Sequence, residues 1–230
     1  MSNSDDRISA LRSNSSAIAT LARLNHDFSK SIWVDIRRMV SNIQGYQRIG
    51  LTHDQILEYY ENNVECFDLL KRELSRADLG LNDMNIRVGP RGRFAVFSHN
   101  GLNRDIFFSE ESHGTQRFFE IFPVLYFSLQ IGGLAFIDEL DADLHPLLVQ
   151  EILRWFQQSE RNSHGAQLLF SAHNASLMDH LEKEEVVFTE KARDGKTQLF
   201  KASDIKGLRR EPNLMRKYLG GSLGALPQIG

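Results

Sequence analysis

Residues 132–146 read GGLAFIDELDADLHP and join a short apolar run to a dense group of acidic side chains. The apolar run, residues 133–137, predicts a buried strand, and Asp138 and Glu139 follow it directly. Three more side chains that could bind a ligand follow within six residues: Asp141, Asp143 and His145. Because like charges repel, this strand end must be balanced by a metal ion, a nucleotide–metal complex or solvent.

The composition bounds the class of protein. The 230 residues are 41% hydrophobic, enough to bury a core as one domain, or as one domain with an appendage. The net charge of −3 argues against a globally basic nucleic-acid binder, and the single cysteine, Cys66, excludes an internal disulfide framework. No apolar run reaches the roughly 18 residues of a membrane span, and the start lacks the apolar core of a secretory signal. These properties predict a cytoplasmic protein without a membrane segment.

The first third of the chain has helical periodicity. A capping-box pattern at residues 52–55 precedes apolar residues spaced three and four apart, which predicts one helical run that ends at Gly80. Two shorter helices are predicted at residues 8–24 and 28–40. Residues 1–84 are therefore expected to form a helical arm or lid region.

The pattern changes from residue 85, where strand-like and helix-like segments begin to alternate. The predicted elements are strands at residues 85–88, 94–98 and 105–109, a helix at 114–130, a strand at 134–137, a helix at 146–158, a strand at 167–171, a helix at 175–181, and a final hairpin of 185–189 and 198–202. Strands that alternate with helices are typical of a parallel sheet. Residues 85–230 are therefore predicted to be an α/β lobe with a mostly parallel sheet flanked by helices.

Three features of this lobe fall at or beside the carboxyl ends of strands, where α/β sheets bind ligands. Asp138 and Glu139 end one strand, and His173 follows the next one. Ser112 and Gly114 begin a helix, whose unpaired N–H groups and positive dipole end favour a phosphate. The sequence therefore predicts a phosphate cradle, an acidic strand end and a histidine at one site.

In their order and setting, these motifs resemble those of the ATPases of ABC type. The closer resemblance is to the chromosome-maintenance (SMC) and OLD-like branch, the AAA-family ATP-binding proteins of bacterial defence systems. The matches are the signature S-x-G-x-Q at Ser112, Gly114 and Gln116, the Walker B strand at 134–139, the D-loop with His-Pro at 140–146, the switch histidine at His173 and the closing segment at 218–227. The resemblance implies the C-terminal lobe of a P-loop ABC-type ATPase, preceded by a helical region.

The resemblance also implies a role for each matched residue. Asp138 would hold Mg²⁺, Glu139 would orient or deprotonate the attacking water, and His173 would contact the γ-phosphate of ATP. The implied nucleotide-binding residues are Ser112, Gly114 and Gln116, which act from the opposite subunit, and Asp141, which lies in the D-loop at a dimer seam. The implied cofactors are ATP and Mg²⁺, and the implied assembly is a nucleotide-driven dimer that controls a nuclease or toxin in anti-phage defence.

One motif of the family has no match. The phosphate loop G-x-x-x-x-G-K-[ST], called Walker A, binds the β- and γ-phosphates. The only Gly-Lys-Thr lies at residues 195–197, the residue five positions before Gly195 is Glu190, and the triplet sits between two strand-like runs, which predicts a hairpin turn. The chain therefore resembles the C-terminal half of an ATPase, from a split gene, a truncated gene or a fragment. It would act as an ATPase when a Walker A-bearing chain complements it.

Two other functions stay open from the residues alone. Asp141 and Asp143, with Glu110 or Glu111 from an earlier strand end, loosely match the acidic set of a Toprim-like Mg²⁺-dependent nuclease. A non-catalytic module that only dimerises is the third reading. A local basic patch is either a solvated turn or a nucleic-acid contact; it consists of Arg87, Arg91 and Arg93.

Several side chains also have ordinary structural interpretations. Asp141 and Asp143 suit the N-cap and first turn of the helix that follows, and His145 is expected to bond backbone near its start. Arg117 is either a solvated helix residue or a phosphate contact. An aromatic cluster on the helix at 114–130 is predicted to pack in the core: Phe118, Phe119, Phe122, Tyr126 and Phe127.

Overall fold

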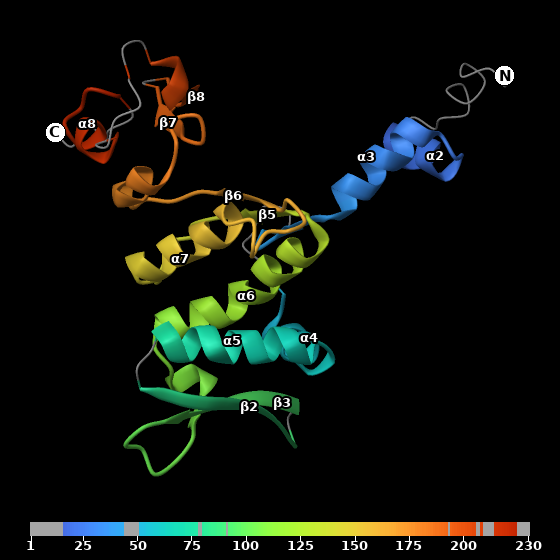
Figure 1. Cartoon of the computed structure of the whole chain (residues 1–230), viewed down its shortest axis with the longest axis vertical. Coiled ribbons are helices and arrows are strands. Elements are labelled where there is room, and N and C mark those ends of the chain that lie inside the picture. The colour runs from blue at the N-terminus through green and yellow to red at the C-terminus, as the bar shows by residue number, and fades with distance from the viewer. Residues whose placement is uncertain are drawn as a thin grey trace. The chain divides into compact units, whose positions relative to one another are not determined.

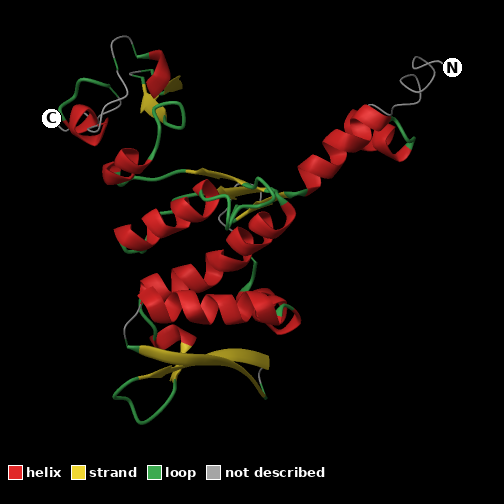
Figure 2. Ribbon diagram, in the orientation of Figure 1, coloured by secondary structure: helices red, strands yellow, loops and turns green. Residues whose placement is uncertain are grey.

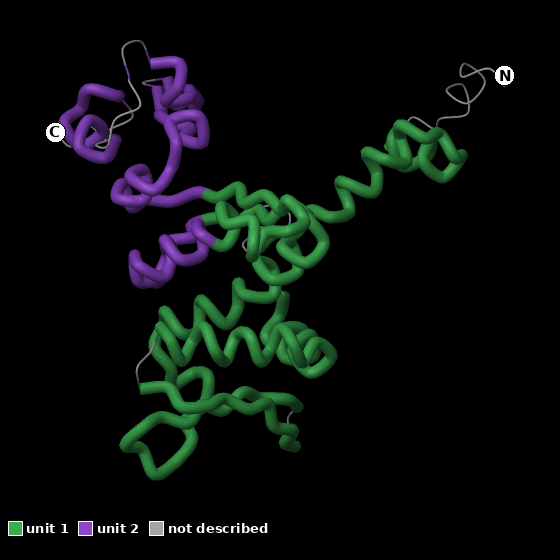
Figure 3. The backbone as a smooth tube through the Cα atoms, in the orientation of Figure 1, with its two compact units in different colours: residues 1–138, 155–170 green, residues 139–154, 171–230 purple. Residues whose placement is uncertain are grey.

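The computed structural model describes residues 16–43, 51–77, 80–90, 92–192, 194–205, 208 and 214–224. The chain divides into two compact units, which are described separately below (Figure 3). Unit 1 comprises residues 1–138 and 155–170, and unit 2 comprises residues 139–154 and 171–230. The predicted boundary between residues 84 and 85 stays a prediction.

A three-stranded parallel sheet of unit 1 carries the acidic strand end (Figure 2). Its order is β1 (Met39–Ser41), β5 (Leu134–Ile137) and β6 (Gln167–Phe170), and β5 pairs in parallel with both neighbours. The long helix α6 (His113–Ile131) contacts β1 and β5. The prediction of an α/β fold with a parallel sheet flanked by helices is confirmed.

Strand β1 corrects the prediction of a helix through residue 40. The described helices of this segment are α2 (Ala17–Arg23) and α3 (Asp27–Arg37), so the chain leaves the helix before Met39. Val40 then pairs with Ala135 of β5. Pairing with a strand about 95 residues away overrides the local helical periodicity.

The predicted single helix after residue 52 is two helices, α4 (His53–Asn62) and α5 (Val64–Ala77). The capping box is confirmed: the hydroxyl of Thr52 accepts from the N–H of Gln55, and the Gln55 side chain accepts from the N–H of Thr52. The break falls at Asn63, whose Nδ2 donates to the carbonyl of Tyr59 at 2.8 Å. Asparagine side chains compete for backbone groups in this way, which disfavours them inside helices.

A second sheet of unit 1 is antiparallel and consists of β2 (Leu81–Gly89), β3 (Gly92–His99) and β4 (Ile106–Phe107). The three predicted strands are thus present, although the first two are longer and the third shorter. Helix α5 contacts both α6 and β2 (Figure 1). A short 3-10 turn, η1 (Phe108–Glu110), leads from β4 to α6.

Aromatic side chains fill the core between α4 and α6. Phe118, Phe119 and Phe122 are fully buried, and the hydroxyl of Tyr60 donates to the carbonyl of Phe119 at 2.7 Å. The predicted core role is confirmed for these three phenylalanines, whereas Phe127 is 36% exposed. A pocket of about 240 Å³ lies beside this core, and its walls include Phe122, Trp155, Glu73 and Arg161.

Two adjacent glycines join α6 to β5, and each allows a close backbone approach. Gly132 ends α6 in the left-handed region at φ 63°, the conformation that glycine adopts most easily. A Cβ on Gly133 would lie 2.2 Å from the carbonyl oxygen of Arg38, the group that accepts the N–H of Leu134. The start of β5 therefore requires glycine for steric reasons.

Unit 2 has its own small core, next to the hairpin β7 (Val187–Lys191) and β8 (Thr197–Lys201). The buried residues of this core are Val186, Phe188, Ala202, Leu208, Leu214 and Leu223. Gly195 lies in the hairpin turn at φ 81°, so the Gly-Lys-Thr triplet is a turn, as predicted. The other elements are η2 (Ala175–His180), which is a 3-10 helix, η3 (Ala202–Asp204) and α8 (Leu214–Leu219).

Helix α7 (Pro146–Gln157) begins in unit 2 and ends in unit 1. His145 accepts the N–H of Leu147 through Nδ1 at 3.2 Å, as expected for a residue that bonds backbone at the helix start. Among the described residues, no helix combines the length and the apolar composition that crossing a membrane requires.

Candidate functional site at the ends of the parallel strands

The backbone of Asp138 is held at the carboxyl end of β5 by two side chains of unit 1. Its N–H donates to Oδ1 of Asn42 at 2.8 Å, and its carbonyl accepts from Nδ2 of Asn42 at 3.0 Å. The guanidinium of Arg117 donates to the same carbonyl at 3.2 Å. Arg117 is therefore more than a solvated helix residue, since it contacts the backbone of the acidic strand end, and its predicted phosphate contact stays a prediction.

Glu139, in unit 2, is positioned by the residue that follows β6. The N–H of Glu139 donates to the hydroxyl of Ser171 at 2.8 Å, and the N–H of Leu140 donates to the Ser171 carbonyl at 3.0 Å. Glu139 adopts φ 50°, which is unusual for a residue other than glycine, and such strained residues cluster at functional sites. Its carboxylate lies 3.7 Å from Nε2 of His173, whose side chain is 85% exposed. The structure thus brings two of the predicted catalytic residues together.

The carboxylate of Asp141 holds the backbone of the loop that carries His173. It accepts the N–H of His173 at 3.0 Å and the N–H of Asn174 at 2.8 Å. Asp141 therefore clamps the loop after β6, a role that differs from the helix cap suggested by the sequence. Asp143, like Glu139, adopts a positive backbone angle, with φ at 61°.

We expect Asp141→Ala to loosen this loop. Two hydrogen bonds to a charged acceptor are lost, and the expected cost is about 2 kcal/mol of unfolding free energy. Hydrogen–deuterium exchange should become faster at the amides of His173 and Asn174, and Asp141→Asn should show a smaller effect because one oxygen remains. Unchanged exchange at both amides in Asp141→Ala would contradict the clamp.

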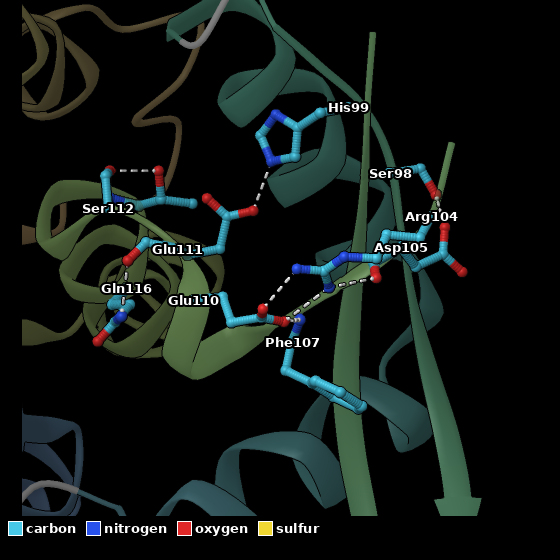
Figure 4. Close-up of polar contacts among 10 residues, drawn as sticks. Ser98, His99, Arg104, Asp105, Phe107, Glu110, Glu111, Ser112 and Gln116 are labelled. Atoms are coloured by element: carbon cyan, nitrogen blue, oxygen red, sulfur yellow. Dashed lines mark hydrogen bonds and ion pairs between the residues drawn. The ribbon is translucent and has the colours of Figure 1, made fainter. Parts of the chain in front are cut away.

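The signature residues lie at the start of α6 in unit 1 (Figure 4). Ser112 is the N-cap: its hydroxyl accepts the N–H of Thr115 at 3.1 Å and lies 2.9 Å from the Thr115 hydroxyl. Gln116 donates through Nε2 to the carbonyl of Glu111 at 2.8 Å, and Gly114 is in the first turn. The predicted helix N-terminus is thus present, with its serine engaged as the cap.

A buried contact between a carboxylate and an imidazole lies next to this turn. The carboxylate of Glu111, which is nearly fully buried, lies 2.5 Å from Nε2 of His99 at the end of β3 (Figure 4). Glu110 faces a different network, in which Arg104 and the N–H of Phe107 lower its pKa to about 2. Both glutamates named for the Toprim-like reading therefore have local partners, and none of these contacts supports a shared metal.

The basic patch is largely neutralised by neighbouring acids. Arg87 forms an ion pair with Asp105, and Arg93 forms ion pairs with Glu61 at 2.5 Å and Asp54 at 3.7 Å. Arg91 lies outside the described residues. These pairs favour the solvated-turn interpretation over a nucleic-acid contact.

The chemistry of the side chains fits Mg²⁺ and a nucleotide. Mg²⁺ takes oxygen ligands and usually keeps several waters, so that one or two carboxylates and the phosphates suffice to bind it. Asp138 offers such a carboxylate, and the N-terminus of α6 offers N–H groups to a phosphate. Among the described residues, no group of three or more His, Cys, Asp or Glu side chains is arranged to hold a metal.

Two residues that hold the backbone of Asp138 and Glu139 were not predicted from the sequence, Asn42 and Ser171. Asn42 follows β1 at the same sheet edge as Asp138. A correct prediction of β1 would therefore have identified Asn42 as a candidate. Ser171 follows β6 directly, and its position after an apolar run was the available signal. The roles of the seven predicted site residues toward ATP and Mg²⁺ stay predictions.

A parallel sheet flanked by helices, with an acidic strand end and a capped helix N-terminus, defines an ATPase-like domain with a nucleotide-binding fold. A family described as "AAA domain, putative AbiEii toxin, Type IV TA system" matches residues 3–179, and the chain belongs to this family. No curated protein matches the chain in sequence.

Two solved structures are distant neighbours. One, from work on the ATP-driven dimerization and DNA stimulated activation of SMC ATPases, matches with 13% identity and a TM-score of 0.49 over 73% of this chain and 96% of that chain. The other is an SMC head bound to the C-winged helix domain of ScpA, with 14% identity and a TM-score of 0.40 over 64% of this chain and 47% of that chain.

Proposed function

We propose that this chain is the ATP-binding and hydrolysing half-domain of an ABC-type ATPase, completed by a Walker A-bearing partner chain. The observation that carries the proposal is the 3.7 Å distance between the Glu139 carboxylate and Nε2 of His173, with Asp141 holding the backbone of the loop that carries His173. A carboxylate and an imidazole at adjacent strand ends can orient a water and contact a phosphate. Membership of an AAA family supports this chemistry.

The parallel sheet offers a place for the partner. Among the described strands, β6 pairs only with β5, and its Leu169 is 53% exposed. Met39 lies on the same face of the sheet by register and is 51% exposed. Parallel sheets are normally covered on both faces. A strand and a helix from a Walker A-bearing half would cover this edge and face.

In the proposed mechanism, each residue has one task. The carboxylate of Asp138 would hold Mg²⁺, and the ion would supply positive charge to the phosphates of ATP. Glu139 orients the attacking water and accepts its proton, while His173 contacts the γ-phosphate. The α6 N-terminus binds the nucleotide from the opposite protomer, through Ser112, Gly114 and Gln116.

The proposed role of the assembly is the control of an effector in the cytoplasm. The family's description names a putative toxin of a type IV toxin–antitoxin system, which supports a link to such a system. The controlled partner is proposed to be a nuclease or toxin in anti-phage defence. The assembly is proposed to form as a nucleotide-driven dimer, either of two copies or of this chain with the Walker A-bearing partner.

The proposal is tested by measuring ATP hydrolysis by the chain alone and with the N-terminal half of a complete ATPase of the same family. We expect almost no turnover alone, because no phosphate loop is present in the sequence, and Mg²⁺-dependent turnover in the mixture. The control is the same half with its Walker A lysine replaced by alanine.

Two results would contradict the proposal of an ATP-hydrolysing half-domain. Robust turnover by the chain alone that survives Glu139→Gln would refute the assignment of the catalytic residues. ATP-dependent association without any turnover would favour the non-catalytic dimerisation module.

A further inference from the structure

Asn42 is a buried polar residue whose side-chain amide both donates to and accepts from one distant residue. It is 6% exposed, and its amide donates to the Asp138 carbonyl and accepts the Asp138 N–H, across 96 positions of the chain. Its own N–H donates to the carbonyl of Phe136 at 3.3 Å, which extends the pairing of β1 with β5. The backbone of Asn42 is thus held by β5, and its side chain bonds to both the N–H and the carbonyl of Asp138.

We infer that Asn42 is a positioning residue that sets the direction of the Asp138 carboxylate for a divalent cation, an inference that rests on the proposed function. A bidentate amide contact leaves the peptide groups on either side of Asp138 little freedom to rotate. The Asp138 carbonyl also accepts from Arg117, so both of its lone pairs are engaged. The position of Cα and Cβ of Asp138 therefore depends on Asn42.

The expected consequence is an effect on cation binding. Groups that orient a metal-binding side chain typically change metal affinity or activity by about 10–100-fold when they are replaced. The Asn42 side chain bonds to the backbone of Asp138, so Asn42 acts through Asp138. Its loss should therefore raise the Mg²⁺ concentration that is required for half-maximal ATP hydrolysis. At saturating Mg²⁺, the loss should reduce kcat by a smaller factor.

Two substitutions separate the two hydrogen bonds. Asn42→Leu keeps the branching at Cγ and removes both bonds, whereas Asn42→Asp keeps an acceptor for the Asp138 N–H and removes the donor to its carbonyl. Hydrogen exchange at the Asp138 amide in the chain alone should become faster in Asn42→Leu and stay slow in Asn42→Asp. This readout needs neither nucleotide nor partner.

Asn162 provides the matched control. It also bridges backbone groups of unit 1, since it donates to the carbonyls of Phe156 and Ala166 and accepts the N–H of Ala166 at 2.6 Å. Asn162→Leu should lower the melting temperature as Asn42→Leu does, but it should leave exchange at Asp138 and the Mg²⁺ dependence of the assembly unchanged.

In the assembly with the Walker A-bearing half, we expect Asn42→Leu to raise the apparent Mg²⁺ constant for ATP hydrolysis about tenfold or more. An unchanged Mg²⁺ constant, or unchanged exchange at Asp138, would overturn the inference. If the assembly of the unsubstituted chain hydrolyses no ATP, the proposed function fails, and the exchange at Asp138 still decides whether Asn42 holds this residue.

Discussion

Glu139→Gln should lower kcat for ATP hydrolysis by about 10²–10⁴-fold in the assembly with a Walker A-bearing half, the range of a lost general base. The amide keeps the shape of the side chain but cannot accept a proton from the attacking water. The backbone of Glu139 is held independently, by its N–H bond to Ser171, so the substitution should leave the strand end in place. Steady-state turnover and ATP-dependent association, measured on the same samples, check this result.

The two measurements should diverge, because the substitution removes the chemical step and leaves nucleotide binding intact. We expect association with the Walker A-bearing half to persist or to last longer, since bound ATP is no longer consumed. Glu184→Gln is the control in the same unit, because this glutamate is exposed and its contact with Lys183 is long, at 3.9 Å. Turnover that is equal in the two variants would exclude Glu139 as the base.

Gly133→Ala should destabilise unit 1 by about 3 kcal/mol, at the upper end of the usual cost of overpacking. The added Cβ would lie 2.2 Å from the Arg38 carbonyl oxygen, and this oxygen belongs to backbone that cannot move aside as a side chain can. The same carbonyl accepts the N–H of Leu134, so any relief of the clash weakens the pairing of β1 with β5. Denaturant unfolding followed by circular dichroism measures the loss.

Gly89→Ala is the matched control for this prediction. A Cβ at Gly89 would lie 3.0 Å from the edge of the Phe94 ring, a side chain that can shift. We therefore expect a cost well below that of Gly133→Ala. Equal stability of the Gly133→Ala variant and the unsubstituted chain would show that the backbone approach at the start of β5 is not tight.

Much of the secondary structure follows from local rules, and the sequence predicted it. The residues that begin and end helix α6, a serine N-cap and a glycine C-cap, are adjacent to the helix in the sequence. The predicted span of 114–130 differs from the observed one by a single residue at each end. Strand β5 and the hairpin turn at Gly195 were predicted equally well. In each case the deciding interactions lie within a few residues of the element.

Strand β1 could not be predicted, because its three residues have no strand pattern of their own. Met39–Ser41 become a strand only by pairing with Leu134–Phe136. The consequence reaches the site, since an unrecognised β1 also hides Asn42. The break at Asn63 is a smaller error of the same kind, in which one side-chain hydrogen bond outweighs a continuous apolar periodicity.

By itself, the sequence determined the α/β class, the acidic end of β5 and the capped start of α6, because each is a matter of residue types at short spacing. Tertiary structure alone decided which groups hold the acids in place. Asp141 reaches the His173 N–H across 32 positions, and Asn42 reaches Asp138 across 96. Contacts over such separations depend on how the strands pair, and no local pattern encodes that pairing.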